Sequence, residues 1–488
     1  MLPFIFRNTT FRILILTLML IIPSMVSAQL IPIKSIPVAT GDQFLIYPSQ
    51  NVSMAGLGIA INDSLFDPFR NPARGNLISG SQIITNPSAY TISDNLGSAQ
   101  TLPLAVLSRS EEWFGTVSLA IQEVTPSETN TEVYADGNGV LGNYYVSASL
   151  GRQPVGSDIS LGVSFSWARL KSVGGVEYLY GRSNRIEQIG KMIDLRLGMV
   201  AKVGDKKILE STLVYNKYDV THLTQNVFPW FIPERRQMTP FPAPEENQDK
   251  THTLGLDLGY TQSFFETGWQ LGGLVTINRK MHPKIPNYTI MNIRRDPGDT
   301  WAYNLGVGLA KEKNGSVIGI DFIYEPIWSH TWANASAPIE IGDQVVVQAN
   351  EKTVDNYFTF WNWIFRLGLR VKDKSQAVDV GFEIRNISYE LLQKDYRVNS
   401  HRTQYEQWYE YTFSLGFKLF FKPFQIGYQG RATLGTGIPS TMIDRITFNS
   451  ERAMNFSPDF LPAPNGALSV TEAIILSHRI TLSIPIGG

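Results

Sequence analysis

The side chains that most often carry out enzymatic chemistry are sparse in this sequence and form no recognisable constellation. The chain has no Cys, which excludes disulfides, thiolate metal sites and Cys nucleophiles. No two His residues have the i, i+4 spacing of a zinc-binding helix, and no Gly-x-Ser-x-Gly elbow occurs. The six His residues are His222, His252, His282, His330, His401 and His478. We therefore predict a protein that is not an enzyme, with no metal site and no cofactor.

The first 28 residues have the organisation of a secretory signal peptide. Arg7 and Arg12 form a basic start, residues 13–22 form an apolar run, and Val26-Ser27-Ala28 supplies the small residues that signal peptidase reads. The run is too short to span a bilayer, which takes about 20 apolar residues. We predict export with cleavage after Ala28. The net charge then changes from −1 to −3, because two Arg and no acidic residue are removed.

The hydropathy of the remaining chain separates two kinds of membrane protein. The mean hydropathy is −0.08, and no segment after Ile22 reaches 18 consecutive apolar residues. A protein with membrane-spanning helices is therefore excluded. A membrane β-barrel is compatible with these values, because its strands carry apolar side chains only at alternate positions. The small net charge gives no indication of nucleic-acid binding.

Several segments alternate with the period of two that a β-strand requires. Between 363 and 371 the odd-numbered residues are apolar, and the even-numbered ones include Arg366, Gly368 and Arg370. The pattern recurs at 193–203, 254–260, 378–385 and 411–419. A soluble β-sandwich also alternates, but its strands are shorter, at about 5–6 residues. We expect the charged residues to face a solvated lumen or to pair within it: Asp194, Arg196, Arg366, Arg370, Asp379, Glu383 and Arg385.

The connections between these segments alternate in length along the whole chain. Short ones such as Gly204–Lys206 and Lys372–Lys374 fall between long ones such as Val220–Thr251 and Ser388–Glu410. Outer-membrane barrels have short periplasmic turns and long external loops. We count 16 strands, the first near Ser81–Tyr90 and the last near Thr471–Ile486, and an even count puts both termini in the periplasm. Because lipid offers no hydrogen bonds, the sheet must close.

The segment that precedes the first strand differs from the rest. It reads Ser53-Met54-Ala55-Gly56-Leu57-Gly58-Ile59-Ala60, then Asn62-Asp63, then Asn71-Pro72-Ala73. Small residues let the backbone approach a neighbour closely, and Asn-Pro initiates a turn. The segment is too short and irregular to be a domain. We therefore predict three parts: a signal peptide at 1–28, a plug or periplasmic cap at 29–78, and an all-β transmembrane antiparallel barrel at 79–488.

The order of these motifs resembles the N-terminal hatch of FadL-type outer-membrane long-chain fatty-acid transporters. It equally resembles the related PorV/PorQ-type barrels of Bacteroidetes-like bacteria. The likeness covers residues 44–121 and includes Leu102-Pro103-Leu104-Ala105. It implies a plug inside the lumen and about 14 strands, so the expected number is 14–16. The plug residues that carry it are Gly56, Gly58, Asn62, Asp63, Asn71, Pro72 and Ala73.

The resemblance implies two different functions. FadL-type members bind hydrophobic compounds in a groove between two outer loops and release them sideways through an opening in the wall. PorV-type members serve type IX secretion and carry exported proteins from the translocon. We predict passage of hydrophobic, fatty-acid-like small molecules across the bacterial outer membrane. The alternative is a secretion accessory protein whose partners are the translocon and its cargo proteins.

An apolar cluster in Val220–Thr251 is the candidate hydrophobic-ligand loop. It contains Phe228, Trp230 and Phe231, and it is stiffened by Pro229 and Pro233. An apolar group outside the membrane is typical of a ligand groove. The alternative interpretation is an aromatic belt that packs on the rim of the barrel.

Overall fold

The computed structural model describes residues 30–486, except 79, 128–131, 134–140, 176–182, 233–236, 265–266, 283–297, 336 and 440–466. The predicted signal peptide, residues 1–28, lies outside the described residues. Helical structure in the described chain is confined to η1 (Val52–Met54), α2 (Asp67–Arg70) and η2 (Pro72–Leu77). None of the helices in these ranges is long and apolar enough to cross a membrane.

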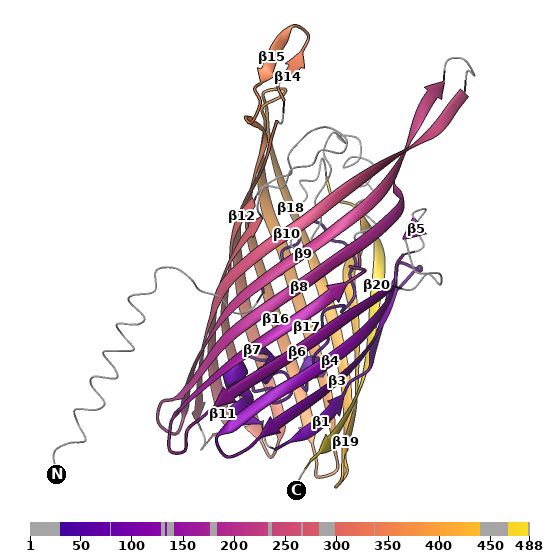
Figure 1. The fold of residues 1–488 in the computed structure, drawn as a ribbon. Coiled ribbons are helices and arrows are strands. Elements are labelled where there is room, and N and C mark those ends of the chain that lie inside the picture. The colour runs from indigo at the N-terminus through magenta and orange to yellow at the C-terminus, as the bar shows by residue number, and fades with distance from the viewer. Residues whose placement is uncertain are drawn as a thin grey trace, which may run out of the picture.

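The described strands form a closed antiparallel barrel with 16 strand positions (Figure 1). The first position is shared by β1 (Gln82–Thr85) and β2 (Ser88–Ile92). The others are β3 (Ser98–Arg109), β4 (Trp113–Thr125), β6 (Leu141–Arg152), β7 (Ile159–Leu170), β8 (Ser183–Lys202), β9 (Lys207–Ile232), β10 (Gln237–Phe264), β11 (Trp269–His282), β12 (Gly298–Lys313), β13 (Ser316–Asn334), β16 (Lys352–Lys372), β17 (Gln376–Asp395), β18 (Ser400–Phe420), β19 (Gln425–Pro439) and β20 (Val470–Pro485).

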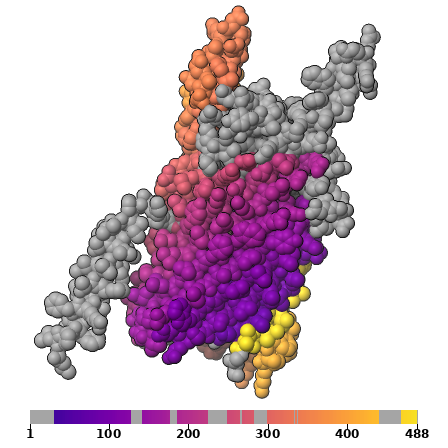
Figure 2. All heavy atoms as spheres, in the orientation of Figure 1, coloured from indigo at the N-terminus to yellow at the C-terminus, as the bar shows by residue number. Residues whose placement is uncertain are grey.

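The last strand closes the barrel against the first. β20 pairs with β19 on one side and with both β1 and β2 on the other, and β1 and β2 also pair with β3. Three further strands lie outside the barrel wall. β5 (Glu132–Val133) pairs with β8 in parallel, and β14 (Ile339–Ile341) and β15 (Gln344–Val347) form a hairpin that stands above the rim (Figures 1 and 2).

The all-β barrel is therefore confirmed, and so is the count of 16 that the alternation predicts. The 14 strands implied by the family resemblance are wrong for this chain. The physical reason is that the resemblance ends near residue 121, whereas the strand number is set by how many hairpins follow. The ends of the sheet lie close to their predicted places, at Gln82 and Pro485.

Two segments expected to be long loops are strands instead. β9 and β10 stay paired through most of Val220–Thr251, up to Ile232 opposite Gln237, and continue beyond the rim as a two-stranded ribbon (Figure 1). In Ser388–Glu410, β17 and β18 pair as far as Asp395 opposite Ser400. The reason is that backbone hydrogen bonds can extend a hairpin into water, where alternation of apolar and polar residues is no longer required.

The two faces of the barrel wall differ as the alternation predicts. On β18, Phe413 and Leu415 face outward and are 52% and 55% exposed, whereas the intervening Thr412 and Ser414 are buried. The predicted inward charges are paired, which confirms the network. Their closest contacts are Arg196–Asp194 at 2.6 Å, Arg366–Glu383 at 2.6 Å, Arg370–Asp379 at 2.7 Å and Arg385–Glu325 at 3.1 Å.

Residues 30–78 lie inside the barrel and touch its wall directly. A row of inward-facing glycines leaves room for them, and we call it the glycine belt. An added Cβ at Gly272 would overlap the carbonyl oxygen of Ile59, and one at Gly381 would overlap the amide nitrogen of Ala55. The belt consists of Gly162, Gly198, Gly272, Gly308, Gly319, Gly368, Gly381 and Gly416. Segment and wall thus approach backbone to backbone.

The start of the described chain is also fixed in the lumen. Ile31 and Ile33 pack in an apolar cluster with Phe358, Phe360 and Tyr389 of the wall. The buried Lys280 donates to the carbonyl oxygen of Ile31 at 2.6 Å. The segment is therefore anchored on the β11–β18 side of the barrel before it reaches η1.

The glycine belt predicts an asymmetry between two neighbouring residues. Gly272→Ala places a methyl group against the backbone of Ile59, so we expect it to lower the free energy of unfolding by about 1–3 kcal/mol. Gly273→Ala adds the same methyl group where nothing lies within 4 Å, and it should leave stability unchanged. Urea unfolding in detergent micelles would measure both, and equal effects of the two variants would contradict the close approach.

Candidate functional site

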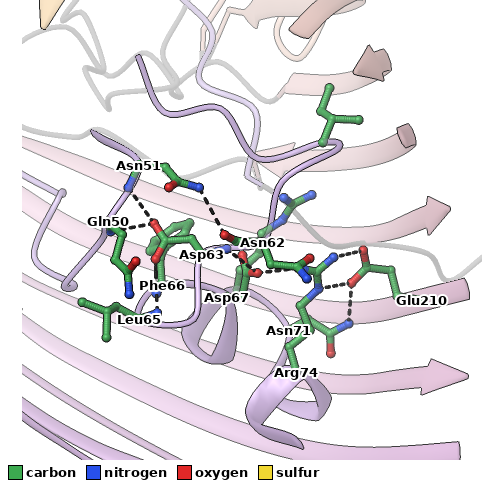
Figure 3. Close-up of polar contacts among 12 residues, drawn as sticks. Gln50, Asn51, Asn62, Asp63, Leu65, Phe66, Asp67, Asn71, Arg74 and Glu210 are labelled. Carbon is green, nitrogen blue, oxygen red and sulfur yellow. Dashed lines mark hydrogen bonds and ion pairs between the residues drawn. The ribbon is translucent and has the colours of Figure 1, made fainter. Parts of the chain in front are cut away.

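The carboxylate of Asp63 organises the turns of the N-terminal segment (Figure 3). It is 3% exposed, and Oδ2 accepts from the Ser49 hydroxyl at 2.6 Å and from the Gln50 amide nitrogen at 2.8 Å. Oδ1 accepts from the amide nitrogens of Leu65 and Phe66 at 3.1 and 3.2 Å. A charged acceptor that satisfies several buried N–H donors fixes a loop that has little regular structure.

Arg74 connects this segment to the barrel wall. Its guanidinium is 5% exposed and forms ion pairs with Asp67 of α2 and with Glu210 of β9, the latter at 2.5 Å. Asn71 donates to the same Glu210 at 3.3 Å (Figure 3). Arg70 reaches a second wall carboxylate, Asp257 of β10, at 3.0 Å. Two cations of the segment thus neutralise two acids of the wall.

The electrostatics of this cluster follow from its burial. Burial would lower the pKa of Arg74, but the carboxylates of Asp67 and Glu210 outweigh it and raise that pKa, so Arg74 is charged. Burial raises the pKa of Asp67 to about 6, although Arg74 acts to lower it. A proton taken up by the cluster at acidic pH therefore goes to Asp67.

The predicted plug residues come together along one path on the inner wall. Gly56 has a left-handed backbone with φ of 71°, and its amide nitrogen donates to the Asn51 carbonyl at 2.8 Å. The amide nitrogen of Gly58 donates to Asp321 of β13 at 2.9 Å. Asn62 accepts from Arg74 at 3.2 Å. These contacts position the segment, and a functional role of the plug residues stays a prediction.

The path ends with Asn71-Pro72-Ala73, which lies against the glycines of β7 and β8. Asn71 caps η2 by accepting from the amide nitrogen of Ala73 at 3.1 Å. Pro72 and Ala73 occupy the space that the Cβ atoms of Gly162 and Gly198 would fill. The Asn-Pro-Ala motif therefore forms a tight turn that fits against the wall.

Sequence reasoning missed the wall residues that bind this segment. Ser53 donates to Asp379 of β17 at 2.7 Å, and Asp379 also contacts Arg370 at 2.7 Å and Lys418 at 3.0 Å. Their inward position was predictable from the alternation. Their partners were not, because Ser53 and Asp379 are 326 positions apart.

The first strand of the barrel is interrupted at Asn86-Pro87. Thr85 pairs with Leu104 of β3 and Ser88 pairs with Thr101, so Asn86 and Pro87 have no register partner in the ladder with β3. The residues that would oppose them are Leu102 and Pro103. In this register Asn86 would face Pro103, and Pro87 would face Leu102. Proline has no N–H to donate to a ladder, so the wall is weak where each of the two facing segments contains a proline.

A few hydrogen bonds bridge this interruption. The Thr85 hydroxyl donates to the Pro103 carbonyl at 2.8 Å, and the Ile480 amide nitrogen of β20 donates to the Pro87 carbonyl at 2.9 Å. Asn86 is 1% exposed, and its Nδ2 has no hydrogen-bond acceptor among the described residues. Such a buried donor is available for a water molecule or a polar group of a ligand.

Cavities lie on both sides of the interrupted strand. The larger has a volume of about 620 Å³ and opens on the outward face. It is lined by Pro87 and by Leu102, Ile121 and Ile480, which are 61%, 52% and 53% exposed. The smaller, of about 20 Å³, lies toward the N-terminal segment. The residues that line both cavities are Ser88, Ala89, Thr101, His478 and Arg479.

The inner side of β2 is apolar. Tyr90 and Ile92 pack in one buried cluster with Ile36, Val38 and Ile46 of the N-terminal segment. Arg479 of β20, at the boundary of the two cavities, donates to the carbonyl oxygens of Leu45 and Tyr47 and so holds the segment beside β2. Apolar surface is therefore present on both sides of the interruption.

The structure assigns the candidate ligand-loop residues to strands. Phe228, Trp230 and Phe231 belong to β9, opposite Phe241, Thr239 and Met238 of β10. Their side chains lie outside the part of the chain that the structure describes. A role in ligand binding stays a prediction.

Comparisons with known proteins concern the barrel as a whole. No family model and no curated protein matches the chain. Among solved structures, it is similar to a Pseudomonas aeruginosa FadL homologue, with 12% identity, a TM-score of 0.47, and coverage of 92% of this chain and 100% of that one.

Two further solved structures are similar at the same level. CymD, a monoaromatic hydrocarbon channel, shares 12% identity at a TM-score of 0.40, covering 93% of this chain and 99% of that one. The Pseudomonas putida toluene transporter TodX shares 11% identity at 0.37, covering 94% and 100%. These are likenesses to solved barrel structures at low identity. The function has to follow from the chain's own residues.

Removing Arg74 should loosen the N-terminal segment. Arg74→Ala leaves Asp67 and Glu210 buried without their shared cation, so we expect a loss of about 3–5 kcal/mol in the free energy of unfolding. We also expect higher ion conductance in planar bilayers. In the control Arg152→Ala, the lost partner Glu112 lies in an exposed pair, and the effect should be much smaller. Equal losses in the two variants would contradict the anchoring role.

The pKa of Asp67 predicts a pH dependence. Because this pKa is raised from 3.8 to about 6 in the folded protein, the folded state binds more protons than the unfolded state between these values. The contribution of Asp67 to stability is thus fully present below 3.8 and is lost as the pH rises through about 6. Asp67→Asn should remove this slope from the thermal midpoint measured against pH, and an unchanged slope would assign it to another group.

Proposed function

We propose that this protein sits in the bacterial outer membrane and passes hydrophobic small molecules through its wall, with residues 30–78 as the plug. The observation that carries the proposal is the interrupted first strand. Asn86 and Pro87 lack ladder pairing to β3, the outward apolar cavity lies beside them, and the buried apolar cluster lies on the inner side of the adjoining β2.

The chemistry of the site fits an uncharged or largely apolar molecule. In the described residues, the N-terminal segment lies against the inner wall and is held there by ion pairs such as Arg74–Glu210 and Arg70–Asp257. A hydrophobic molecule gains by moving from one apolar surface to another, and the outward cavity then opens toward lipid. The plug motif at Gly56, Gly58, Asn62, Asp63 and Asn71–Ala73 holds the segment that covers the inner side.

The FadL homologue, CymD and TodX support this direction only as proteins of similar fold, two of them described as a hydrocarbon channel and a toluene transporter. Fatty-acid-like molecules are the ligand class that we propose, with outer-membrane lipid around the barrel. Phe228, Trp230 and Phe231 are proposed as the external capture site.

The interrupted strand can be locked to test the proposal. Ala89 and Gln100 face each other across β2 and β3, beside the interruption. Because the chain has no Cys, the pair Ala89→Cys/Gln100→Cys would form a single engineered disulfide. We expect uptake of a fluorescent fatty acid by proteoliposomes to fall to the level of empty vesicles under oxidation and to recover on reduction.

The control is Ile83→Cys/Val106→Cys. These residues face each other across β1 and β3 and, unlike Ala89 and Gln100, do not line the outward cavity. Its disulfide should leave uptake unchanged. Uptake that is insensitive to the Ala89–Gln100 disulfide, or absent from the reduced protein, would overturn the proposed lateral route.

A further inference from the structure

A row of charged side chains crosses four neighbouring strands near the rim that carries the long hairpins. Arg169 of β7 is directly opposite Lys191 of β8, Lys191 is opposite Asp219 of β9, and Asp219 is opposite Lys250 of β10. Because residues directly opposite in a sheet share a face, these side chains lie side by side. We call these four residues the outer row. The four strands are neighbours on the face of the barrel seen in Figure 1.

The outer row lies on the outward face of the wall. Arg169 and Lys191 are exposed, whereas Ala168 and Leu170, which flank Arg169, are completely buried. Below the row on the same face are exposed apolar residues, including Phe165 and Leu195 at 45% and 44%. The row therefore lies above this apolar band, with one further exposed apolar residue, Ile189 of β8 at 54%, on its rim side.

The row carries an excess of positive charge. Lys217 of β9 adds a cation beside Asp219, at 3.8 Å. Four cations and one carboxylate make a local net charge of +3: Arg169, Lys191, Lys217, Lys250 and Asp219. Within the described part of the chain, neither Arg169 nor Lys191 has an ion-pair partner. Like charges that face each other across a strand pair repel, so these two favour an anion between them.

We propose that the outer row binds the phosphorylated headgroup of a membrane lipid whose acyl chains lie along the apolar band below. A phosphate accepts charge-assisted hydrogen bonds from Arg and Lys together. The exposed apolar residues Phe165 and Leu195 lie below the outer row and would contact acyl chains. This favours a lipid over a free phosphate ion as the ligand. This inference rests on the proposed membrane location and is independent of transport.

Native mass spectrometry of the whole protein in a neutral detergent would test the site. The probes are phosphatidic acid, zwitterionic phosphatidylcholine and inorganic phosphate. We expect retention of phosphatidic acid, and Arg169→Gln/Lys191→Gln should weaken it about 30-fold, from about 1 kcal/mol for each basic residue. Heat-modifiable gel mobility of the variant should match that of the parent, because both residues are on the outside of the wall.

Lys206→Gln/Lys207→Gln is the matched control. It removes the same charge at the opposite end of the barrel, where Lys206 precedes β9 and Lys207 is its first residue. Retention unchanged in this variant supports the outer row. Equal loss in both variants, equal retention of phosphatidylcholine, or full competition by inorganic phosphate would each overturn the lipid site. Fatty-acid uptake is measured separately, so failure of the transport proposal would not affect this result.

Discussion

The direct contact between the backbone of the N-terminal segment and the backbone of the barrel wall is the constraint on which the rest of the structure depends. Ile59 lies against Gly272 and Ala55 against Gly381, with no room for a side chain at either glycine. Where the two backbones are this close, water is excluded and their N–H and C=O groups need hydrogen-bond partners from the protein. The wall supplies them from strands on the same inner face, as Asp321 does for the amide nitrogen of Gly58 and Arg370 for the carbonyl oxygen of Gln50.

Ion pairs make the barrel wall depend on the N-terminal segment as well. Glu210 and Asp257 of the wall are buried acids, and the cations that neutralise them, Arg74 and Arg70, come from the segment. Without the segment, these acids would need water or other cations, since a buried charge is costly when it is unpaired. Segment and barrel therefore form one folded unit, although the sequence presents them as two regions of different character.

The sequence predicts the barrel well because its physical cause is local. Alternation at 363–371 and 411–419 indicates which face of each strand contacts apolar surroundings. Because this pattern lies within each segment, the strands can be counted one by one from the sequence. The extent of β9, β10, β17 and β18 was not predictable, because beyond the rim both faces meet water and the alternation ends. The partners of the inward charges require the closed barrel.

Part of the candidate site could be predicted from the sequence. Asn71-Pro72-Ala73 and Gly56-x-Gly58 marked where the segment turns and touches its neighbour. The interruption also left a signal, since Pro87 and Pro103 both stand in segments that otherwise read as strands. Only the register shows that Asn86-Pro87 lies opposite Leu102-Pro103. The buried Asn86 amide could not be inferred, because burial there depends on the packing of the whole first strand.

The split first strand also bears on how the barrel resists force. β3 is joined to it through four residues of β1 and four of β2, whereas β17 and β18 share twenty pairs. A load applied around the circumference concentrates on the shortest ladder, because hydrogen bonds in a long ladder share it. Under such a load the cylinder should tear first between the split first strand and β3. Its mechanical limit is thus set by a few residues on either side of Pro87.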